Sequence, residues 1–371
     1  MKKILLVPVI AALAASSLNA AVDSTLHHYL LFGQSNMAGG GSGIAFGTGG
    51  PTDTVIPADC DTTSRIKVLS FCTCSAKYSA DCPKYTQSRT TDTWYTAFPP
   101  LHICQEGISP GDWFAKTMLD SVREDIKIGL IPCALSGQAL SVFVKGGSGF
   151  KLPTWAHPTL GDSSPYAWMI KRCKQAQQTG VIKGMLLHQG ESGPGAPTWN
   201  NMAKAIFDSL KKDLGLPSTT PVVVGELRAD NYAAFNRDAV DAFAKSYTNC
   251  GLASSTGCAV QSDDGFHFAA AGMRELGKRY AIALLGLASQ SYIPRKGTSH
   301  IIDVPVPAAK YPDFKQAKTG ITLYSLNGRI MRSYPAADAG SALRRLNAGG
   351  GVYIVSCKLS DGRTAIVPFV R

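Results

Sequence analysis

The sequence lacks the features that mark membrane-spanning, repeat and zinc-ribbon proteins. Its N-terminal apolar run, Ile4 to Ala15, is shorter than the roughly 20 residues of a transmembrane helix, and no other run is long and apolar enough. No period of about 20 to 50 residues repeats, which excludes a solenoid. Paired zinc ligands are missing, because the closest cysteines form only a Cys72-x-Cys74 pair. We therefore expect no membrane span and no metal.

The net charge of +11 is unevenly distributed. From Arg295 to the C-terminus there are 12 Lys/Arg and 4 Asp/Glu, whereas residues 21–294 carry 23 and 22. The basic tail lacks the aromatic residues that interleave with basic ones in RNA-binding motifs. We expect a solvated basic face there and no nucleic-acid partner.

The first 20 residues have the pattern of a secretory signal peptide. Lys2 and Lys3 form the charged end, the apolar run follows, and Leu18-Asn19-Ala20 forms a small-residue cleavage site. We expect residues 1–20 to direct export, so that the mature protein is secreted or lies at the cell surface.

The ten cysteines suit an oxidising compartment. Five lie in one polar segment with too few aliphatic residues to form its own core: Cys60, Cys72, Cys74, Cys82 and Cys104. We expect disulfides to stabilise this insertion, although spacing does not determine which cysteines pair. We also expect Cys250 to pair with Cys258, and Cys133 to be a buried thiol.

Apolar strands alternate with helical segments across residues 21–288, which predicts a parallel sheet covered by helices on both faces. Residues 289–311 are rich in proline and polar residues and read as a linker. Residues 312–371 contain hairpin patterns around Asn327-Gly328 and Asp361-Gly362, which predict a small all-β domain.

Residues suited to acyl transfer follow three predicted strands: Ser35, Gly137, and the run His188-Gln189-Gly190-Glu191. The carboxyl ends of parallel strands share one edge, so these residues can meet. A serine at this edge is a candidate nucleophile if a histidine and a carboxylate reach it. Taken alone, Ser35 fits an ordinary Asn/Ser/Gly turn better than a nucleophile, because such turns are common.

The candidate base is His267, three residues after Asp264 on a turn before the last helix. This spacing lets the carboxylate bond one ring nitrogen while the other faces the serine. Glu191 is a second candidate acid, which either supports the base or only holds its own turn. Which of the two carboxylates acts stays open.

Acyl transfer also requires hydrogen-bond donors for the oxyanion. The candidates are the backbone N–H groups of Ser35 and Gly137 and the side-chain amide of Gln189. We expect the substrate to be contacted by the neighbouring residues Gln34, Asn36 and His188.

A second serine lies in Gly107-Ile108-Ser109-Pro110-Gly111, which matches the nucleophile-elbow pattern. That chemistry needs the N–H of the following residue, and Pro110 has none. We expect Ser109 to be structural and Pro110 to begin a helix.

Four segments in order resemble those of a known family: Gly33-Gln34-Ser35-Asn36-Met37, Ile131-Pro132-Cys133-Ala134 with Gly137, His188-Gln189-Gly190-Glu191, and Asp264-Gly265-Phe266-His267-Phe268. Over about residues 26–288 the chain resembles the SGNH hydrolases, and within them carbohydrate esterase family 6 and the sialate O-acetylesterase-like group. The resemblance implies a three-layer α/β/α flavodoxin-like fold and removal of acetyl groups from sugars without a cofactor.

The resemblance also implies roles for individual residues. Ser35 is the nucleophile, His267 the base, Asp264 the orienting acid and Glu191 a second helper. The oxyanion hole consists of Ser35, Gly137 and Gln189. Ser136-Gly137 departs from the pair of glycines that the family often shows, and the Cys-rich insertion is not general in it.

The C-terminal segments 323–329 and 351–355 look like the sorting domains of type IX secretion. They are also similar to basic C-terminal modules of fibre-degrading bacteria, and a generic β-sandwich is the remaining alternative. The first two would contact the secretion machinery or the cell surface.

We therefore expect a secreted serine carboxylic ester hydrolase that deacetylates plant polysaccharide, with acetylxylan as the leading substrate. The alternative within enzymes is a sialate or other sugar O-acetylesterase. The alternative from another class is a carbohydrate-binding protein whose esterase fold has lost activity.

Overall fold

The structure is a computed structural model that describes residues 22–40, 55–74, 82, 88–104, 106–147, 160, 164–228, 235–261 and 266–287, together with the backbone of four C-terminal strands. The predicted signal peptide, the predicted linker and Asp264 lie outside the described residues. None of the described helices has the length and apolar character needed to cross a membrane.

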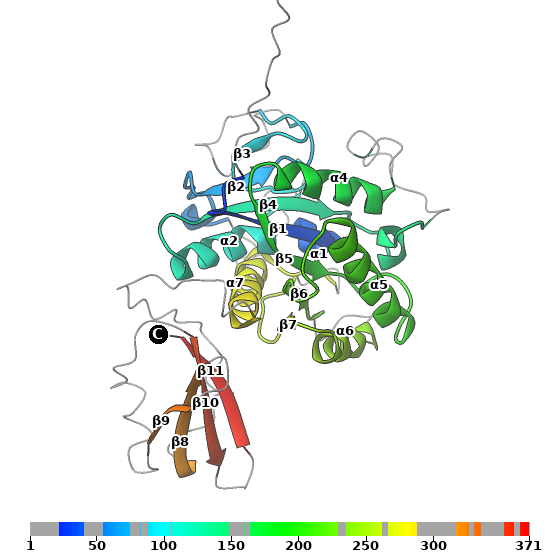
Figure 1. Cartoon of the computed structure of the whole chain (residues 1–371). Coiled ribbons are helices and arrows are strands. Elements are labelled where there is room, and N and C mark those ends of the chain that lie inside the picture. Colours follow the sequence, from blue (N-terminus) through cyan, green and yellow to red (C-terminus); the bar gives the residue numbers. More distant parts are fainter. Residues whose placement is uncertain are drawn as a thin grey trace, which may run out of the picture.

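The centre of the fold is a seven-stranded sheet with the order β3-β2-β4-β1-β5-β6-β7 (Figure 1). Outside the Cys-rich insertion, the sheet consists of five parallel strands: β1 (Leu26–Gly33), β4 (Lys127–Ala134), β5 (Val181–His188), β6 (Val222–Gly225) and β7 (Cys250–Ala253). Their order β4-β1-β5-β6-β7 is the 2-1-3-4-5 order of the flavodoxin-like sheet. The predicted fold class is therefore confirmed.

The Cys-rich insertion adds two strands beyond β4, namely β2 (Ile66–Leu69) and β3 (Trp94–Thr96). β2 is parallel to β4, whereas β3 is antiparallel to β2, so the sheet is mixed at this edge. No strand was predicted in the insertion. Its strand β3 is the antiparallel addition to the predicted parallel sheet, and an antiparallel neighbour needs no crossover helix.

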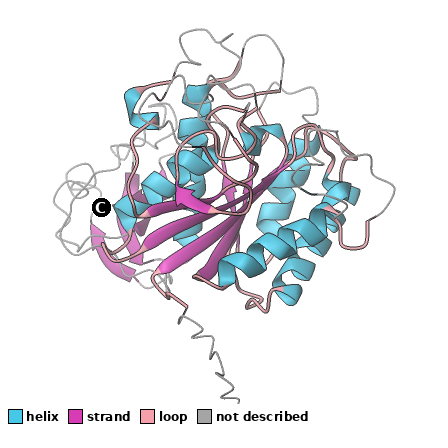
Figure 2. Ribbon diagram, turned by 90° about the horizontal axis from the view of Figure 1, so that it is seen from above, coloured by secondary structure: helices cyan, strands magenta, loops and turns pink. Residues whose placement is uncertain are grey.

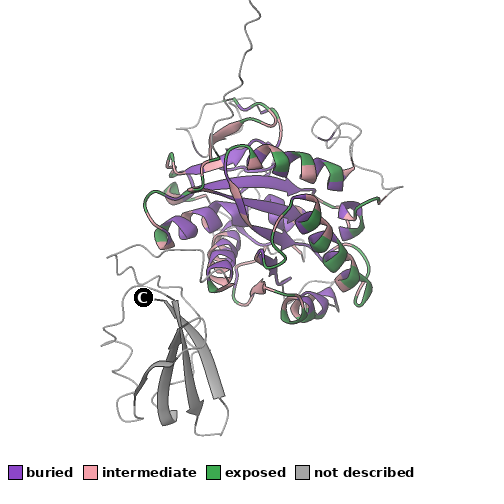
Figure 3. Ribbon diagram, in the orientation of Figure 1, coloured by how far each residue is buried: buried purple, intermediate pink, exposed green. Residues whose placement is uncertain are grey.

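Helices cover both faces of the sheet (Figure 2). Leu30 and Phe32 of β1 pack in one core cluster, together with side chains of α4 (Pro165–Gln177), α5 (Thr198–Asp213) and α6 (Phe235–Ser246). Tyr29 and Leu31 point the other way, into a cluster with α2 (Pro110–Ser121) and α7 (Ala270–Leu287). Figure 3 shows the result, with buried residues facing the sheet and exposed ones facing outward.

Two disulfides cross-link the insertion, Cys60–Cys82 and Cys74–Cys104, as the composition predicted. Cys133 is a buried free thiol, also as predicted. The expected pair of Cys250 and Cys258 is wrong, because both are free. The reason is the sheet between them: Cys250 packs against the cluster under α4 to α6, while Cys258 lies in the cluster under α2 and α7.

The C-terminal region contains a separate four-stranded antiparallel sheet with the order β11-β10-β8-β9. Its strands are β8 (Ala317–Ser325), β9 (Ile330–Tyr334), β10 (Val352–Leu359) and β11 (Thr364–Val370). The two Xaa-Gly turns that predicted the hairpins lie outside the described residues.

Candidate active site

The central strand β1 ends at Gly33 and continues through Gln34 into the short helix α1 (Ser35–Ala38). Gly33 has φ 133°, and a Cβ there would lie 2.0 Å from the backbone oxygen of His188, so a side chain cannot be accommodated. From residue 27 to residue 40 every residue is buried except Ser35. The turn therefore presents one side chain, the serine hydroxyl, at the carboxyl edge of the sheet.

The serine meets a histidine from the far end of the domain. The Oγ atom of Ser35 lies 2.8 Å from Nε2 of His267, which precedes α7. Both side chains are partly exposed. A hydroxyl bonded to an imidazole nitrogen is the arrangement of an activated nucleophile and its general base. With Nε2 directed at the serine, Nδ1 is the nitrogen that remains for an orienting acid.

The side chain of Asn36 ties the segments of these two residues together. Its Nδ2 donates to Oε1 of Glu191 (2.6 Å) and to the backbone oxygen of Phe266 (2.8 Å), and its Oδ1 accepts from the backbone N–H of Phe268 (3.1 Å). Phe266 and Phe268 are the two neighbours of His267 in the chain. One buried amide, directly after Ser35, thus fixes the backbone on both sides of His267.

Glu191, which accepts a hydrogen bond from Asn36, belongs to a buried polar cluster. Oε1 of Glu191 lies 3.4 Å from Nε2 of His188, whose Nδ1 lies 3.2 Å from the hydroxyl of Tyr280. That hydroxyl donates to the backbone oxygen of Leu187 (2.8 Å). Burial raises the pKa of Glu191, but hydrogen bonds from His188 and Asn36 outweigh it and hold the pKa below its usual value. Glu191 is therefore a carboxylate at neutral pH.

The side-chain amide of Gln189 is engaged within the protein. Its Nε2 donates to Oε1 of Gln34 (3.0 Å) and to the backbone oxygen of Ser192 (2.8 Å), while its Oε1 accepts from Nε1 of Trp199 (2.8 Å). Both amide hydrogens thus have acceptors. In this arrangement the amide joins the turns after β1 and β5 and has no hydrogen left for an oxyanion.

Backbone N–H groups offer the remaining oxyanion donors. Gly137 is exposed with φ 74°, and a Cβ built on it would meet no atom within 4 Å, so it faces open space. Its loop is held to the end of β1, because Leu135 N–H donates to the oxygen of Gly33 (2.9 Å). Within the described part of the chain, no acceptor is found for the N–H groups of Ser35 and Gly137.

The predicted substrate-contacting residues lie below the surface of the site. The side chains of Gln34, Asn36 and His188 are 3%, 0% and 0% exposed. The structure places them beneath Ser35 and His267, where they hold the two loops. These residues stand next to reactive residues in the motifs, which suggested contact with substrate. Their burial indicates a supporting position instead.

The buried carboxyl of Glu106 lies near the site and was not predicted from the sequence. Ser136 Oγ donates to Oε1 of Glu106, and burial raises the pKa of Glu106 to about 8, against the lowering effect of that bond and of the Ile103 backbone. Glu106 thus braces the loop that carries Gly137 while keeping its proton at neutral pH. Nothing in the sequence around it marks this role.

The elbow-like serine is structural, as predicted. Ser109 caps α2: its Oγ accepts from the N–H of Gly111 (3.0 Å), and its own N–H donates to Oδ2 of Asp112 (2.9 Å). Pro110 is the first residue of the helix. Ser109 is buried and has no route to a substrate.

Comparisons with known proteins agree with this geometry. A family model described as carbohydrate esterase, sialic acid-specific acetylesterase matches residues 25–286, which include Ser35 and His267. A protein of Arabidopsis thaliana named a probable carbohydrate esterase is 28% identical over 224 residues, covering 57% of this chain and 73% of that protein.

Solved structures show the same fold. A crystal structure of an Arabidopsis thaliana protein has a TM-score of 0.52 at 26% identity, over 70% of this chain and 97% of that one. NanS has a TM-score of 0.50 at 16% identity, over 72% and 98% of the two chains. A structure described as a novel carbohydrate acetylesterase from Xanthomonas citri has a TM-score of 0.50 at 16% identity, over 92% and 77%.

Proposed function

The chain belongs to the carbohydrate esterase family of sialic acid-specific acetylesterases, and we propose that it removes O-acetyl groups from sugars with Ser35 as the nucleophile. The observation that carries the proposal is the 2.8 Å contact between the Ser35 hydroxyl and Nε2 of His267. This contact joins two residues that are far apart in the chain. Ser35 is also the one residue between 27 and 40 that is not buried.

The mechanism is a double displacement. His267 takes the proton of Ser35 Oγ as the oxygen attacks the acetyl carbonyl, and the N–H groups of Ser35 and Gly137 stabilise the oxyanion. The histidine then gives the proton to the leaving sugar oxygen, which leaves an acetyl-enzyme. Water, deprotonated by the same histidine, releases acetate.

The remaining site residues have supporting roles in this proposal. Asp264 orients His267 through Nδ1, as the Asp-x-x-His spacing suggests. Glu191 acts on the histidine through Asn36, whose amide it holds. Gln189 positions the turns after β1 and β5 instead of donating to the oxyanion, because its amide hydrogens already have acceptors.

The proposed substrate is acetylated plant polysaccharide, most specifically acetylxylan, a neutral polymer. Among the described residues, the cation Arg228 packs against the histidine segment. It is buried, and its guanidinium donates to the backbone oxygens of His267 (2.9 Å) and Gln261 (3.3 Å). It is turned toward the protein and not toward an anionic sugar.

The second candidate is a sialate or other sugar O-acetylesterase, which the family description favours. Sialic acid carries a carboxylate that xylan lacks, so the two substrates differ in charge as well as shape. Acetate release from acetylxylan and from O-acetylated sialic acid, measured side by side, separates them. Faster release from the sialic acid would overturn the acetylxylan proposal.

The experiment for the core proposal is turnover of an aryl acetate by S35A. The matched control is S218A, which removes an exposed hydroxyl from the loop between α5 and β6. We expect S35A to lose activity and S218A to keep it. Binding of xylan by the wild type without acetate release would instead favour a non-catalytic carbohydrate-binding protein.

We also propose that residues 1–20 direct export and that residues 312–371, after the linker 289–311, serve sorting or surface attachment. The two disulfides are consistent with an oxidising destination. N-terminal sequencing of the exported product tests the first claim. Localisation of a chain that ends at residue 294 tests the second.

A further inference from the structure

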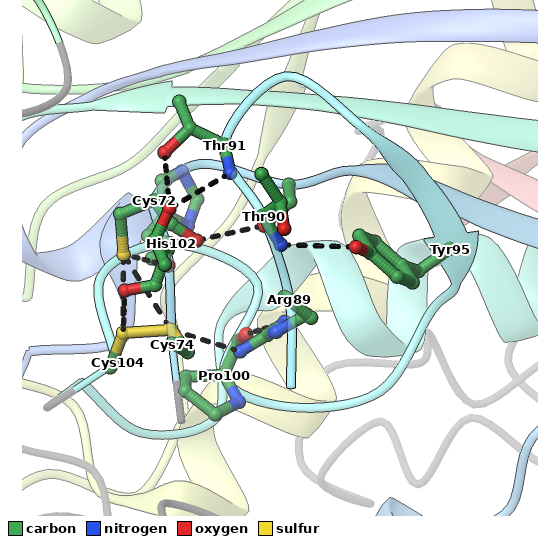
Figure 4. Close-up of a disulfide and its surroundings, with 11 residues drawn as sticks. Cys72, Cys74, Arg89, Thr90, Thr91, Tyr95, Pro100, His102 and Cys104 are labelled. Carbon is green, nitrogen blue, oxygen red and sulfur yellow. Dashed lines mark hydrogen bonds between the residues drawn. A yellow bond between two sulfur atoms is a disulfide. The ribbon is translucent and has the colours of Figure 1, made fainter. Parts of the chain in front are cut away.

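The Cys-rich insertion contains a cluster of three sulfur atoms (Figure 4). Cys74 and Cys104 are joined in a disulfide, and Cys72 is a free thiol. The Sγ atom of Cys72 lies 3.3 Å from that of Cys104 and 3.6 Å from that of Cys74. The other disulfide, Cys60–Cys82, has no comparable third sulfur among the described residues.

We propose that this cluster is a thiol–disulfide exchange site, in which Cys104 alternates between Cys74 and Cys72 as its partner. The thiolate of Cys72 attacks Sγ of Cys104, the Cys72–Cys104 bond forms, the Cys74–Cys104 bond breaks, and Cys74 leaves as a thiolate. Cys72 gives up one proton and Cys74 takes up one. The numbers of thiols and disulfides stay constant, so no oxidant is consumed.

Chain geometry selects Cys104 as the sulfur that is attacked. Attack on Cys74 would join two cysteines that are only two residues apart, which standard disulfide geometry disfavours. The Sγ atom of Cys72 lies beside the disulfide, at similar distances from both of its sulfurs. In-line attack on Cys104 therefore requires a rotation of the Cys72 side chain, which is partly exposed.

A fixed cation lies beside the leaving sulfur. Nη2 of Arg89 is 3.8 Å from Sγ of Cys74, and Nη1 donates to the backbone oxygen of Pro100 (2.7 Å). Two backbone hydrogen bonds of 2.9 Å join Arg89 and Cys74 directly. A guanidinium held in this way stabilises a thiolate at Cys74, which makes it a better leaving group.

The exchange keeps Cys104 cross-linked in both forms, and this matters for the segment that follows it. Glu106 braces Ser136, and the N–H of Gly107 donates to the oxygen of Gly39 (3.0 Å), just after α1. The segment thus supports both loops that carry the proposed oxyanion donors. This consequence, unlike the exchange itself, rests on the proposed function.

The test is disulfide mapping of the full-length oxidised protein. The folded protein is held at mildly alkaline pH, quenched with acid, denatured, and its thiols blocked with a maleimide. Tryptic peptide 68–77, which contains both Cys72 and Cys74, is then sequenced by tandem mass spectrometry. We expect two species linked to Cys104, one blocked at Cys72 and one at Cys74. Blocking at Cys72 alone, at every incubation time, would overturn the proposal.

Variants sharpen the same measurement without using enzymatic activity, so its failure is distinct from failure of the esterase proposal. C74S should form a Cys72–Cys104 disulfide, whereas two free thiols in folded C74S would contradict exchange. R89Q should reduce the species with free Cys74 about tenfold, because a charge-assisted hydrogen bond is lost. Cys60–Cys82 is the internal control, and its appearance in mixed pairs would indicate general scrambling instead of a specific site.

Discussion

Two histidines lie at the same edge of the sheet, and their surroundings differ. His188 is buried, contacts Glu191 and Tyr280, and has its ring edge-on to Phe268 at 5.8 Å. His267 is partly exposed and contacts the Ser35 hydroxyl. The partly exposed His267 can reach both the Ser35 hydroxyl and solvent, whereas the buried His188 can only hold its neighbours. The contrast separates the proposed catalytic pair, Ser35 and His267, from the buried residues that support it.

The largest expected effect on turnover comes from removing Ser35 or His267. S35A and H267A should each lower kcat by about four to six orders of magnitude, because nucleophile and base act as a unit. Steady-state hydrolysis of an aryl acetate measures this. The thermal midpoint should change little, since both side chains are partly exposed. A variant that keeps near wild-type turnover would break the comparison.

The second prediction concerns Asn36, which joins the buried Glu191 to the backbone on both sides of His267. N36A removes three hydrogen bonds, one of which is donated to the buried carboxylate of Glu191. We expect kcat to fall about a hundredfold, since a small displacement of a catalytic group has that effect, with KM nearly unchanged. We also expect unfolding to become easier by about 2–4 kcal/mol. Equal losses in kcat and in substrate affinity would instead point to direct substrate contact by Asn36.

The third prediction concerns the buried carboxylate of Glu191. E191Q should reduce kcat only about tenfold, through Asn36, and destabilise the fold by a few kcal/mol. The folded-state pKa of Glu191 lies below its usual value, so its stabilising contribution is present at neutral pH and is lost as the pH falls through that folded pKa. Chemical denaturation against pH should therefore show less acid destabilisation in E191Q than in the wild type. The control is E124Q, which changes an exposed glutamate. A loss of turnover as large as that of S35A would make Glu191 a second catalytic acid.

The smallest effect on turnover is expected at Glu106, whose pKa is shifted the opposite way. Its folded-state pKa is about 8, against 4.5 for the unfolded chain. Between these values the unfolded chain has lost the proton that the folded protein keeps, so stability falls as the pH rises from 4.5 to about 8. E106Q should remove this decline, which amounts to a few kcal/mol, while kcat changes less than tenfold. Parallel pH profiles for E106Q and wild type would contradict the account.

The sequence predicted the parts of the molecule that depend on local pattern. Alternating apolar strands and helices predicted the layered sheet, and the glycine at the end of β1 predicted where Ser35 would be presented. Ser109 is structural as predicted, because Pro110 after it lacks the N–H group that an oxyanion hole would need.

Predictions that depended on which side a residue faces were less successful. Gln34, Asn36 and His188 stand beside reactive residues in the motifs, but their direction follows from packing against distant segments. Cys250 and Cys258 are close in the chain and on opposite faces of the sheet. Glu106 meets Ser136 only through the fold, so no spacing rule could find it.

The most direct test of the account is to trap the covalent intermediate. Wild-type protein is mixed with an aryl acetate, quenched in acid during turnover, digested and analysed by mass spectrometry. The account predicts an acetyl group on Ser35, absent from S35A and from wild type without substrate. Acetylation of a different residue in a protein that still turns over, with Ser35 unmodified, would contradict it.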